Sequence, residues 1–105
     1  MLTVEVVPKR RPIRSLAILD AAKGSACMVC GETSDTVVFA HLNESFAGKG
    51  IGQKADDFAG FFACQYCHDQ YDGRIRNVDV DAWTVMRAMY RTIRALIDEG
   101  VIILK

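Results

Sequence analysis

Two C-x-x-C pairs constrain this 105-residue chain more than any other feature. Cys27 and Cys30 form the first pair, and Cys64 and Cys67, followed directly by His68, form the second. Two thiolates separated by two residues can reach one ion from a tight turn, and a second pair completes a tetrahedron. The pattern therefore predicts a structural zinc site. The 33 residues between the pairs exceed the spacing of a short zinc ribbon, so we expect them to contain structure of their own.

Three other interpretations of the cysteines compete with zinc. Disulfides need an oxidising compartment, and residues 1–9 lack the charged and apolar regions of a secretory signal peptide. A thioredoxin-like redox site would use one C-x-x-C on a βαβ unit rather than two. Residues 64–68, C-Q-Y-C-H, match the c-type haem attachment pattern, but haem attachment normally requires export and leaves the first pair unexplained. Zinc held by all four cysteines is favoured, and haem and redox chemistry stay as alternatives.

The composition indicates one small domain. A chain of this length buries roughly 65% of its unfolded surface, so a metal that binds only the folded state would add to its stability. The 13 basic and 13 acidic residues cancel, so bulk charge does not indicate nucleic acid. No apolar stretch approaches the ~20 residues of a membrane span. We therefore expect a soluble protein of a reducing compartment such as the cytoplasm, with no membrane partner.

The chain is expected to consist of a basic N-terminal arm, residues 1–14, and a single domain, residues 15–105. Pro8 and Pro12 flank the basic run in the arm and discourage a helix there. The arm could grip a DNA backbone or could simply keep the protein soluble. Candidate DNA-binding residues lie in the arm and behind the second cysteine pair: Arg10, Arg11, Arg14, Arg74 and Arg76.

Local patterns predict short elements around the cysteines. Residues 15–23 read as a helix with Ser15 as its N-cap, and residues 36–41 are rich in β-branched and aromatic residues and read as a strand. Residues 58–63 are either a second strand or a turn. A short helix is expected from about residue 64 to residue 72.

A long C-terminal helix is the clearest element in the sequence. Asp79 or Asp81 can cap it and Gly100 can close it, and residues 101–104 are expected to add an edge strand. Its arginines, Arg87, Arg91 and Arg94, share one face that either follows phosphates or is simply solvated. Its apolar stripe is expected to pack into the core and consists of Trp83, Met86, Tyr90, Ile93 and Ile97.

Two histidines complete the candidate site. His41 ends the first predicted strand, and His68 lies on the short helix with Asp72 one turn later. Side chains four residues apart project from one face of a helix, so His68 and Asp72 can chelate one divalent ion. If the cysteines bind zinc, we expect His41 to face His68 and Asp72 across a gap.

These residues together resemble the HNH endonuclease motif, which has the ββα-metal fold. The match consists of the first C-x-x-C, the pair Ala40-His41, and the second C-x-x-C with His68. Within the HNH enzymes, the chain most resembles the prophage-encoded YbcO-like nuclease family, over roughly residues 20–76. The narrower match rests on Ala-Ala-Lys-Gly before the first cysteine, on the glycine-rich loop that ends in Lys-Ala-Asp-Asp, and on residues 63–74. The resemblance implies an α+β fold, with a small zinc-stapled ββα-metal core, a flanking N-terminal helix and a long C-terminal helix.

The resemblance also implies an activity: metal-dependent hydrolysis of DNA phosphodiester bonds by a phage or prophage endonuclease. His41 matches the general base of the motif, and His68 matches its metal-ligating histidine. Asp72 would be the second ligand of a catalytic Mg²⁺ or Mn²⁺ ion. DNA is the implied partner, with a phage or host recombination protein as a further candidate, and the oligomeric state stays open.

Two positions depart from the HNH pattern. Many HNH proteins have an acidic metal ligand just before the first histidine, where this chain has Ala40. The asparagine that orients the base has no assigned match, since Asn43 follows His41 closely and Asp57, nearer the expected place, has a different side chain. The alternative function is therefore a non-catalytic zinc module that binds nucleic acid or protein, in which His41 and His68 are structural.

Overall fold

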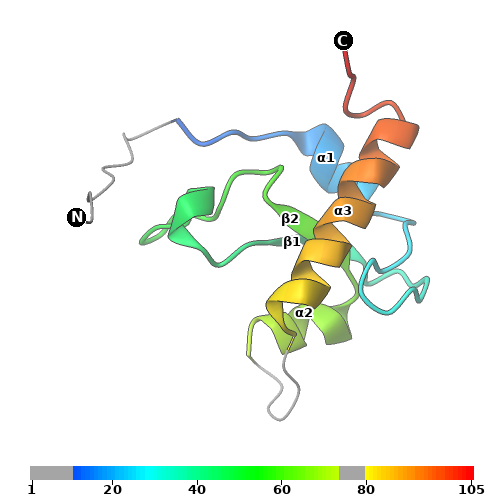
Figure 1. Cartoon of the computed structure of the whole chain (residues 1–105), viewed down its shortest axis with the longest axis horizontal. Helices are drawn as coiled ribbons and strands as arrows, with labels where there is room; N and C mark the ends of the chain where they lie inside the picture. The colour runs from blue at the N-terminus through cyan, green and yellow to red at the C-terminus, as the bar shows by residue number, and fades with distance from the viewer. Residues whose placement is uncertain (1–10, 74–79) are drawn as a thin grey trace.

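A computed structural model of the chain describes residues 11–73 and 80–105 (Figure 1). Within these ranges a two-stranded sheet is packed among three α-helices, which confirms the predicted α+β class. The elements in chain order are α1 (Leu16–Ala21), β1 (Val38–His41), the 3-10 turn η1 (Ser45–Ala47), β2 (Gly60–Ala63), α2 (Gln65–Tyr71) and α3 (Ala82–Asp98). None of the helices in the described ranges has the length and apolar character that a membrane span requires.

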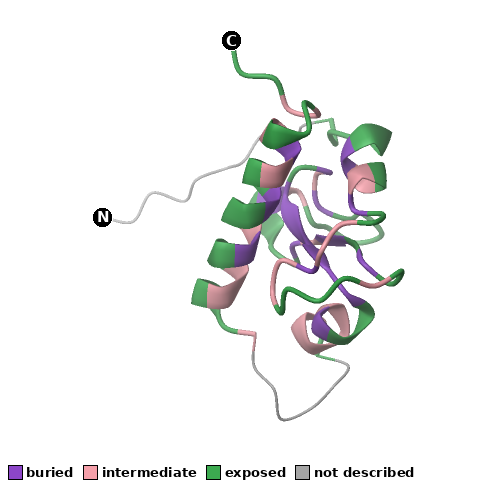
Figure 2. Ribbon diagram, turned by 90° about the vertical axis from the view of Figure 1, so that its right-hand side faces the viewer, coloured by how far each residue is buried: buried purple, intermediate pink, exposed green. Residues whose placement is uncertain are grey.

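The two strands form a short antiparallel sheet at the centre of the core (Figure 2). The register pairs His41 with Gly60 at one end and Val38 with Ala63 at the other. Opposed residues share a face, so Phe39, His41 and Phe62 lie on one face of the sheet, and Ala40 and Phe61 lie on the other. All four residues of β2 are buried.

Gly60 permits the close approach of the two strands beside His41. A Cβ atom at this position would overlap the backbone carbonyl oxygen of Ala40 and would lie 2.7 Å from the Phe39 ring. A glycine is therefore required where β2 begins, although Gly60 does not have a positive φ.

Helix α3 covers the outer edge of β2, across the front of the sheet in Figure 1. The Phe62 amide donates to Thr92 Oγ1 at 3.0 Å, and that hydroxyl donates to the Ala88 carbonyl at 2.8 Å. The Phe62 carbonyl accepts from the Met28 amide at 2.8 Å. Both backbone groups on the outer side of Phe62 are thus hydrogen-bonded, as a buried strand requires.

Helix α3 packs against the core through a face of small residues. The sequence predicted that the face with the large apolar residues would do so. The buried residues are Ala88, Thr92 and Leu96, whereas Trp83 and Tyr90 are 64% and 68% exposed. The expectation that the stripe of Trp83 and Tyr90 packs into the core is therefore wrong. Two faces of this helix have apolar residues at helical spacing, and the small face was selected because it lets α3 approach the edge of β2 and hydrogen-bond to it.

Both ends of α3 lie where the sequence predicts them, with Gly100 closing the helix at a φ of 75°, but the strand expected after it is absent from the described residues. Asp81 caps the N-terminus by accepting from the Thr84 amide at 2.8 Å. At the C-terminus the amides of Val101 and Ile102 both donate to the Leu96 carbonyl, at 2.9 and 3.1 Å. These bonds close the helix and direct the chain away, so the edge strand expected at residues 101–104 does not form.

Candidate metal centre and catalytic site

The four cysteines form one cluster. Their Sγ atoms all lie within 4.8 Å of one another, and Cys30 Sγ and Cys64 Sγ are 3.9 Å apart. A tetrahedral zinc ion with Zn–S bonds of about 2.3 Å holds its sulfurs about 3.8 Å apart, so the cluster fits this ion. None of the four is in a disulfide. Because both pairs belong to one site, neither pair is left over for haem attachment or for a separate redox centre.

The thiols of this cluster differ in how readily they ionise. Burial opposes ionisation of Cys27, but hydrogen bonds from the backbone amides of Cys30, Cys64 and Val29 outweigh it and lower the pKa of Cys27 to about 7. Burial raises the pKa of Cys67, and its thiol neighbours raise it further. One thiolate therefore forms readily at neutral pH, whereas a full set of four needs a cation to offset its mutual repulsion.

Backbone contacts attach the first cysteine turn to the second. The Gly31 amide donates to the Cys27 carbonyl at 2.8 Å, in a turn that places Gly31 at a φ of 81°. The neighbouring Met28 is hydrogen-bonded to β2, as described above. Cys64 is the N-cap of α2, so the helix fixes the direction of the second pair. The cluster thus joins the first loop to the junction between β2 and α2.

His41 is paired with a buried carboxylate. Its Nε2 lies 2.8 Å from Asp57 Oδ1, and the two side chains are 17% and 2% exposed. The Phe39 ring meets the imidazole edge-on, with ring centroids 5.1 Å apart. His41 lines a hollow of about 380 Å³ beside α1, to which Lys23 and Lys54 also contribute. The ring is thus held on one side and open to the hollow on the other.

The environment of Asp57 determines which nitrogen of His41 carries the hydrogen. Its Oδ2 accepts from the Ser15 amide at 2.7 Å, and Lys54 Nζ lies 3.9 Å from Oδ1. Burial alone would raise the pKa of Asp57, but the hydrogen bonds from His41 and Ser15 and the charge of Lys54 outweigh it and lower the pKa. An ionised carboxylate only accepts hydrogen bonds, so His41 Nε2 carries the hydrogen and Nδ1 of the neutral ring holds the lone pair.

Arg14, predicted to contact DNA from a free arm, is attached to the loop before β2. Its guanidinium donates to the Ala55 carbonyl at 2.8 Å, and its Nη1 lies 3.7 Å from Asp57 Oδ1. The Asp57 amide donates to the Ile13 carbonyl at 2.9 Å. The segment that precedes α1 therefore helps to hold Asp57 in place, and a role for Arg14 in DNA binding stays a prediction.

A second pair of a histidine and a carboxylate, His68 and Asp72, lies at α2. His68 Nε2 lies 3.1 Å from Asp72 Oδ2, and both side chains are about one-fifth exposed, at 23% and 20%. Asp72 Oδ1 accepts from Asn43 Nδ2 at 3.1 Å, and the Asn43 amide donates to the Tyr71 hydroxyl at 3.0 Å. The spacing of His68 and Asp72 on one helix face is as the sequence indicates.

The His41–Asp57 pair and the His68–Asp72 pair lie on different faces of the sheet but at the same end of it. Tyr71 of α2 contacts Phe61, with ring centroids 5.2 Å apart, and Phe61 is on the face opposite to His41. The structure therefore does not bring His41 directly against His68. Asn43 connects the two pairs, because it follows His41 by two residues and binds Asp72. A phosphate at this end of the sheet could be approached from both sides.

Two residues of this arrangement were not assigned from the sequence. Asp57 was considered for the role of orienting residue and left open, and it is the partner of His41. Asn43 was given no role, and it binds Tyr71 and Asp72 at the end of α2. A loop of 18 residues separates His41 from Gly60, so the sequence gives no register for the residues inside it. The one available signal for Asp57 was a carboxylate just before a buried apolar strand.

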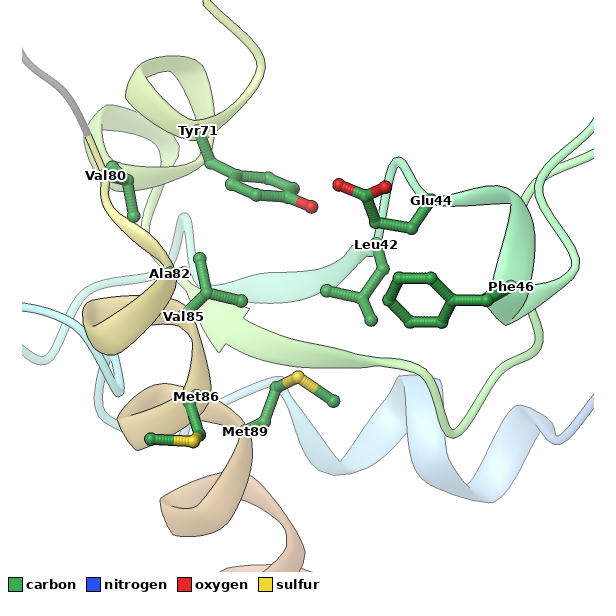
Figure 3. A pocket seen from close by; sticks show the side chains of 9 residues that line it. All are labelled: Leu42, Glu44, Phe46, Tyr71, Val80, Ala82, Val85, Met86 and Met89. Atoms are coloured by element: carbon green, nitrogen blue, oxygen red, sulfur yellow. The ribbon is translucent and has the colours of Figure 1, made fainter. Parts of the chain in front are cut away.

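An apolar pocket of about 500 Å³ lies beside the end of α2 that carries Tyr71, next to the His68–Asp72 pair (Figure 3). Tyr71 points from α2 toward the loop that carries Glu44, and Met86 and Met89 line the opposite wall from α3. Leu42 forms the floor between them. The pocket thus opens where α2, α3 and the end of β1 meet.

The other predicted DNA-binding residues are divided between described and undescribed parts of the chain. Arg11 is exposed, ahead of the segment that binds the Asp57 loop. Arg10, Arg74 and Arg76 lie outside the described residues, as does most of the predicted arm. Their contribution to binding stays a prediction.

Comparison with known proteins gives one family and one solved structure. Residues 16–101 match the family described as "Putative nuclease YbcO". The chain is also similar to a protein in a solved structure described as "Structure of a putative bacteriophage protein from Escherichia coli str. K-12 substr. MG1655". The identity is 30% and the TM-score is 0.60, over 79% of this chain and 99% of the other. No curated protein matches the chain.

Proposed function

The chain belongs to the family described as "Putative nuclease YbcO", and on that premise we propose that it is a metal-dependent DNA endonuclease of the HNH type, from a phage or prophage. The observation that carries this proposal is the 2.8 Å contact between His41 Nε2 and the buried carboxylate of Asp57. A carboxylate that fixes the tautomer and orientation of a histidine prepares the ring to act as a general base. The similar protein from Escherichia coli, whose structure is described as that of a "putative bacteriophage protein", supports the proposed origin.

His41 acts as the base through Nδ1, which holds the lone pair. Nδ1 takes a proton from a water molecule, and the oxygen of that water forms a bond to phosphorus. The bond between phosphorus and the 3′-oxygen breaks, and the 3′-oxygen takes up a proton from solvent. The products carry 5′-phosphate and 3′-hydroxyl ends. Asp57 holds the ring in place and stabilises the imidazolium that forms.

His68 and Asp72 would hold one Mg²⁺ or Mn²⁺ ion. Imidazole and carboxylate are suitable ligands for Mn²⁺, and a carboxylate with water ligands suits Mg²⁺. When bound, such an ion supplies charge that stabilises the phosphate and the leaving oxygen. Asn43 keeps the Asp72 carboxylate oriented through its side-chain amide. The position before His41 is the buried Ala40, so the protein offers two ligands here and the remaining sites would be filled by water and phosphate.

The four cysteines would hold a structural zinc ion that keeps these parts together. They connect the first loop, β2 and α2, and α2 carries the proposed metal ligands. We propose DNA as the substrate and a phage or host recombination protein as a candidate partner inside the bacterial cell.

Plasmid nicking by zinc-loaded protein tests the proposal. We expect nicking with added Mg²⁺ or Mn²⁺, and we expect His41→Ala to lower the rate by about 10²- to 10⁴-fold because the proton acceptor is gone. His68→Ala is expected to require a higher Mn²⁺ concentration for the same rate. EDTA should stop nicking, and re-adding Mg²⁺ with zinc should restore it whereas zinc alone should not.

The zinc content and the melting curve of His41→Ala provide the control for folding. A folded His41→Ala protein that nicks at the parental rate would remove His41 from the mechanism. If the parent protein cleaves none of plasmid, single-stranded and branched DNA under these conditions, the result favours the alternative function, a non-catalytic zinc module.

A further inference from the structure

We propose that the outward face of α3 binds single-stranded nucleic acid, with bases stacked on Trp83 and Tyr90 and phosphates held by Arg87 and Arg94. This inference rests on the proposed function for its biological setting, because it assigns the substrate class of that nuclease. Neither the core nor the proposed catalytic site uses the exposed stripe of α3 that carries Trp83 and Tyr90.

Aromatic and cationic residues alternate along this face. Trp83, Arg87, Tyr90 and Arg94 follow one another at spacings of four, three and four residues. At 3.6 residues per turn these positions lie within about 60° of arc. The buried residues Ala88, Thr92 and Leu96 occupy the opposite side of the helix. The alternation is therefore a property of the solvent-facing side alone.

The aromatic rings are open to contact with a ligand. Trp83 is 64% exposed and Tyr90 is 68% exposed, and together with Met86 and Arg87 they line a shallow hollow of about 340 Å³. The two rings are two helical turns apart, about 10.5 Å along the axis. Arg87 lies between them, so a strand that places bases on both rings would bring a phosphate to the guanidinium.

The charge of this face is complementary to a phosphate backbone. Helix α3 has three arginines and one acidic residue, Asp98 at its C-terminal end, although the whole chain has a formal net charge of zero. Arg94 Nε lies 3.1 Å from Asp98, and Arg91 donates weakly to the Met28 carbonyl at 3.4 Å. The positive charge beside the two aromatic rings is therefore mainly that of Arg87. The Arg94–Asp98 pair is exposed, and exposed pairs are weak, so a phosphate can compete with Asp98 for Arg94.

A second copy of the chain fits this face less well than a nucleic acid does. Antiparallel packing of two α3 helices would bring Arg87 and Arg94 of one copy close to the arginines of the other, and like charges beside a helix seam oppose association. Single strands supply flat, unpaired bases for Trp83 and Tyr90 together with negative charge for the arginines. Bases inside a duplex are stacked on one another and cannot cover the two rings.

The face leads toward the proposed catalytic site. Met86, at its edge, also lines the apolar pocket that contains Tyr71 and Leu42 (Figure 3). Tyr71 precedes Asp72 on α2 and binds Asn43, which connects the two histidine pairs. A strand bound along α3 toward Trp83 would thus continue to the end of the sheet where His41 and Asp72 lie.

The intrinsic fluorescence of Trp83 tests the proposal, because Trp83 is the only tryptophan of the chain. The titration uses zinc-loaded protein and an oligothymidylate, with no added Mg²⁺ or Mn²⁺, so that binding is measured without cleavage. We expect saturable quenching, and an affinity for the single strand at least tenfold above that for a duplex of equal length. Tyr90→Ala is expected to weaken binding by about tenfold or more, since each base–aromatic stack contributes that much.

Matched variants separate stacking from charge. Arg87→Gln should reduce the slope of log Kobs against log salt by about 0.7, the value for one phosphate contact on a single strand. Lys105→Gln removes an equal charge at the exposed C-terminus and should leave the slope unchanged. Tyr66→Ala removes an aromatic ring that is 58% exposed on α2 and should leave the affinity unchanged.

Three outcomes would overturn the proposal: no quenching of Trp83, equal affinity for duplex, or equal losses in Tyr66→Ala and Tyr90→Ala. Sedimentation that shows a dimer dissociated by Tyr90→Ala, with oligonucleotide binding unaffected, would instead assign the face to self-association. The proposed nuclease is judged separately. Binding without nicking would reject the nuclease and keep the binding face. Cleavage of single-stranded DNA that is unaffected by Tyr90→Ala would keep the nuclease and reject the binding face.

Discussion

Asp57 is the residue on which the most contacts of the proposed catalytic site converge. It is 2% exposed, and its carboxylate receives hydrogen bonds from His41 and from the Ser15 amide. These groups come from the end of β1 and from the segment before α1, so one side chain fixes both against the loop before β2. A buried carboxylate with several donors is costly to replace, because its partners are then left without an acceptor.

Replacing this carboxylate by an amide should affect stability in a pH-dependent way. The pKa of Asp57 is lowered in the folded protein, so its ionisation stabilises the fold above the ordinary aspartate pKa of about 3.9, and this stabilisation is lost as the pH falls through the lowered value. We expect Asp57→Asn to reduce the free energy of unfolding by about 1–3 kcal/mol at neutral pH. The difference between parent and variant should shrink in acid.

Urea denaturation of both proteins between about pH 7 and pH 3 measures this difference. Acid also releases zinc from thiolates, but this acts on parent and variant alike and cancels in the difference. Asp56→Asn is the matched control, because its carboxylate accepts from the Ile13 amide at 2.9 Å rather than from the His41 ring. A difference that stays constant with pH would mean that Asp57 is not the titrating group. Nicking should be slowed by Asp57→Asn and kept by Asp56→Asn.

At the scale of an element, α3 shows how one helix can have two apolar faces with different roles. Its buried side contacts the edge of β2 through small residues and one hydroxyl, Thr92, which binds the Phe62 amide. Its exposed side carries the larger residues. Size and spacing alone therefore did not indicate which face packs inward, since burial depends on the partner as well as on the helix.

Alanine substitutions on the two faces of α3 should have unequal effects. Leu96 is 1% exposed, so Leu96→Ala leaves a cavity and is expected to reduce the free energy of unfolding by about 2–5 kcal/mol. Met86 is 56% exposed, so Met86→Ala is expected to reduce it by less than about 1 kcal/mol. Denaturant titration followed by circular dichroism measures both. Equal losses would indicate that the outward stripe packs against something in the folded protein.

At the scale of the whole molecule, the cysteine cluster joins the loop between α1 and β1 to the junction of β2 and α2. The sheet has two strands of four residues each, and sheets this small are marginal without further support. The cluster joins the first loop to the start of α2, which carries His68 and Asp72. Zinc at this position would stabilise the proposed catalytic end of the domain as well as the core.

Removal of the metal should therefore unfold or strongly destabilise the protein. Structural zinc contributes on the order of 10 kcal/mol of binding free energy, and a fraction of that is enough to lower the Tm by more than about 15 °C. We expect one zinc per chain by elemental analysis, and we expect a chelator to lower the Tm and re-added zinc to restore it. Cys64→Ser should reproduce the chelator effect without a chelator. A metal-free protein that melts at the parental Tm would reject the structural role.

The sequence by itself determined the parts of this protein that depend on neighbouring residues. The two C-x-x-C pairs, the i and i+4 spacing of His68 and Asp72, the Ser15 and Asp81 caps and the strand that ends at His41 are all local patterns, because turns and helices are set by residues a few positions apart. The fold class followed from these elements. The two apolar faces of α3 are also visible in the sequence, but local spacing does not show which of them packs into the core.

The tertiary structure alone decided the contacts between residues distant in the chain. Asp57 reaches His41 across 16 positions, and Asn43 reaches Asp72 across 29. Thr92 is buried on α3 because its hydroxyl accepts the hydrogen bond of the Phe62 amide at the edge of β2. Such pairings depend on the register of the strands and on the path of the loops. Chains with the same local patterns can differ in both. The surface that α3 leaves outside is a consequence of those same contacts.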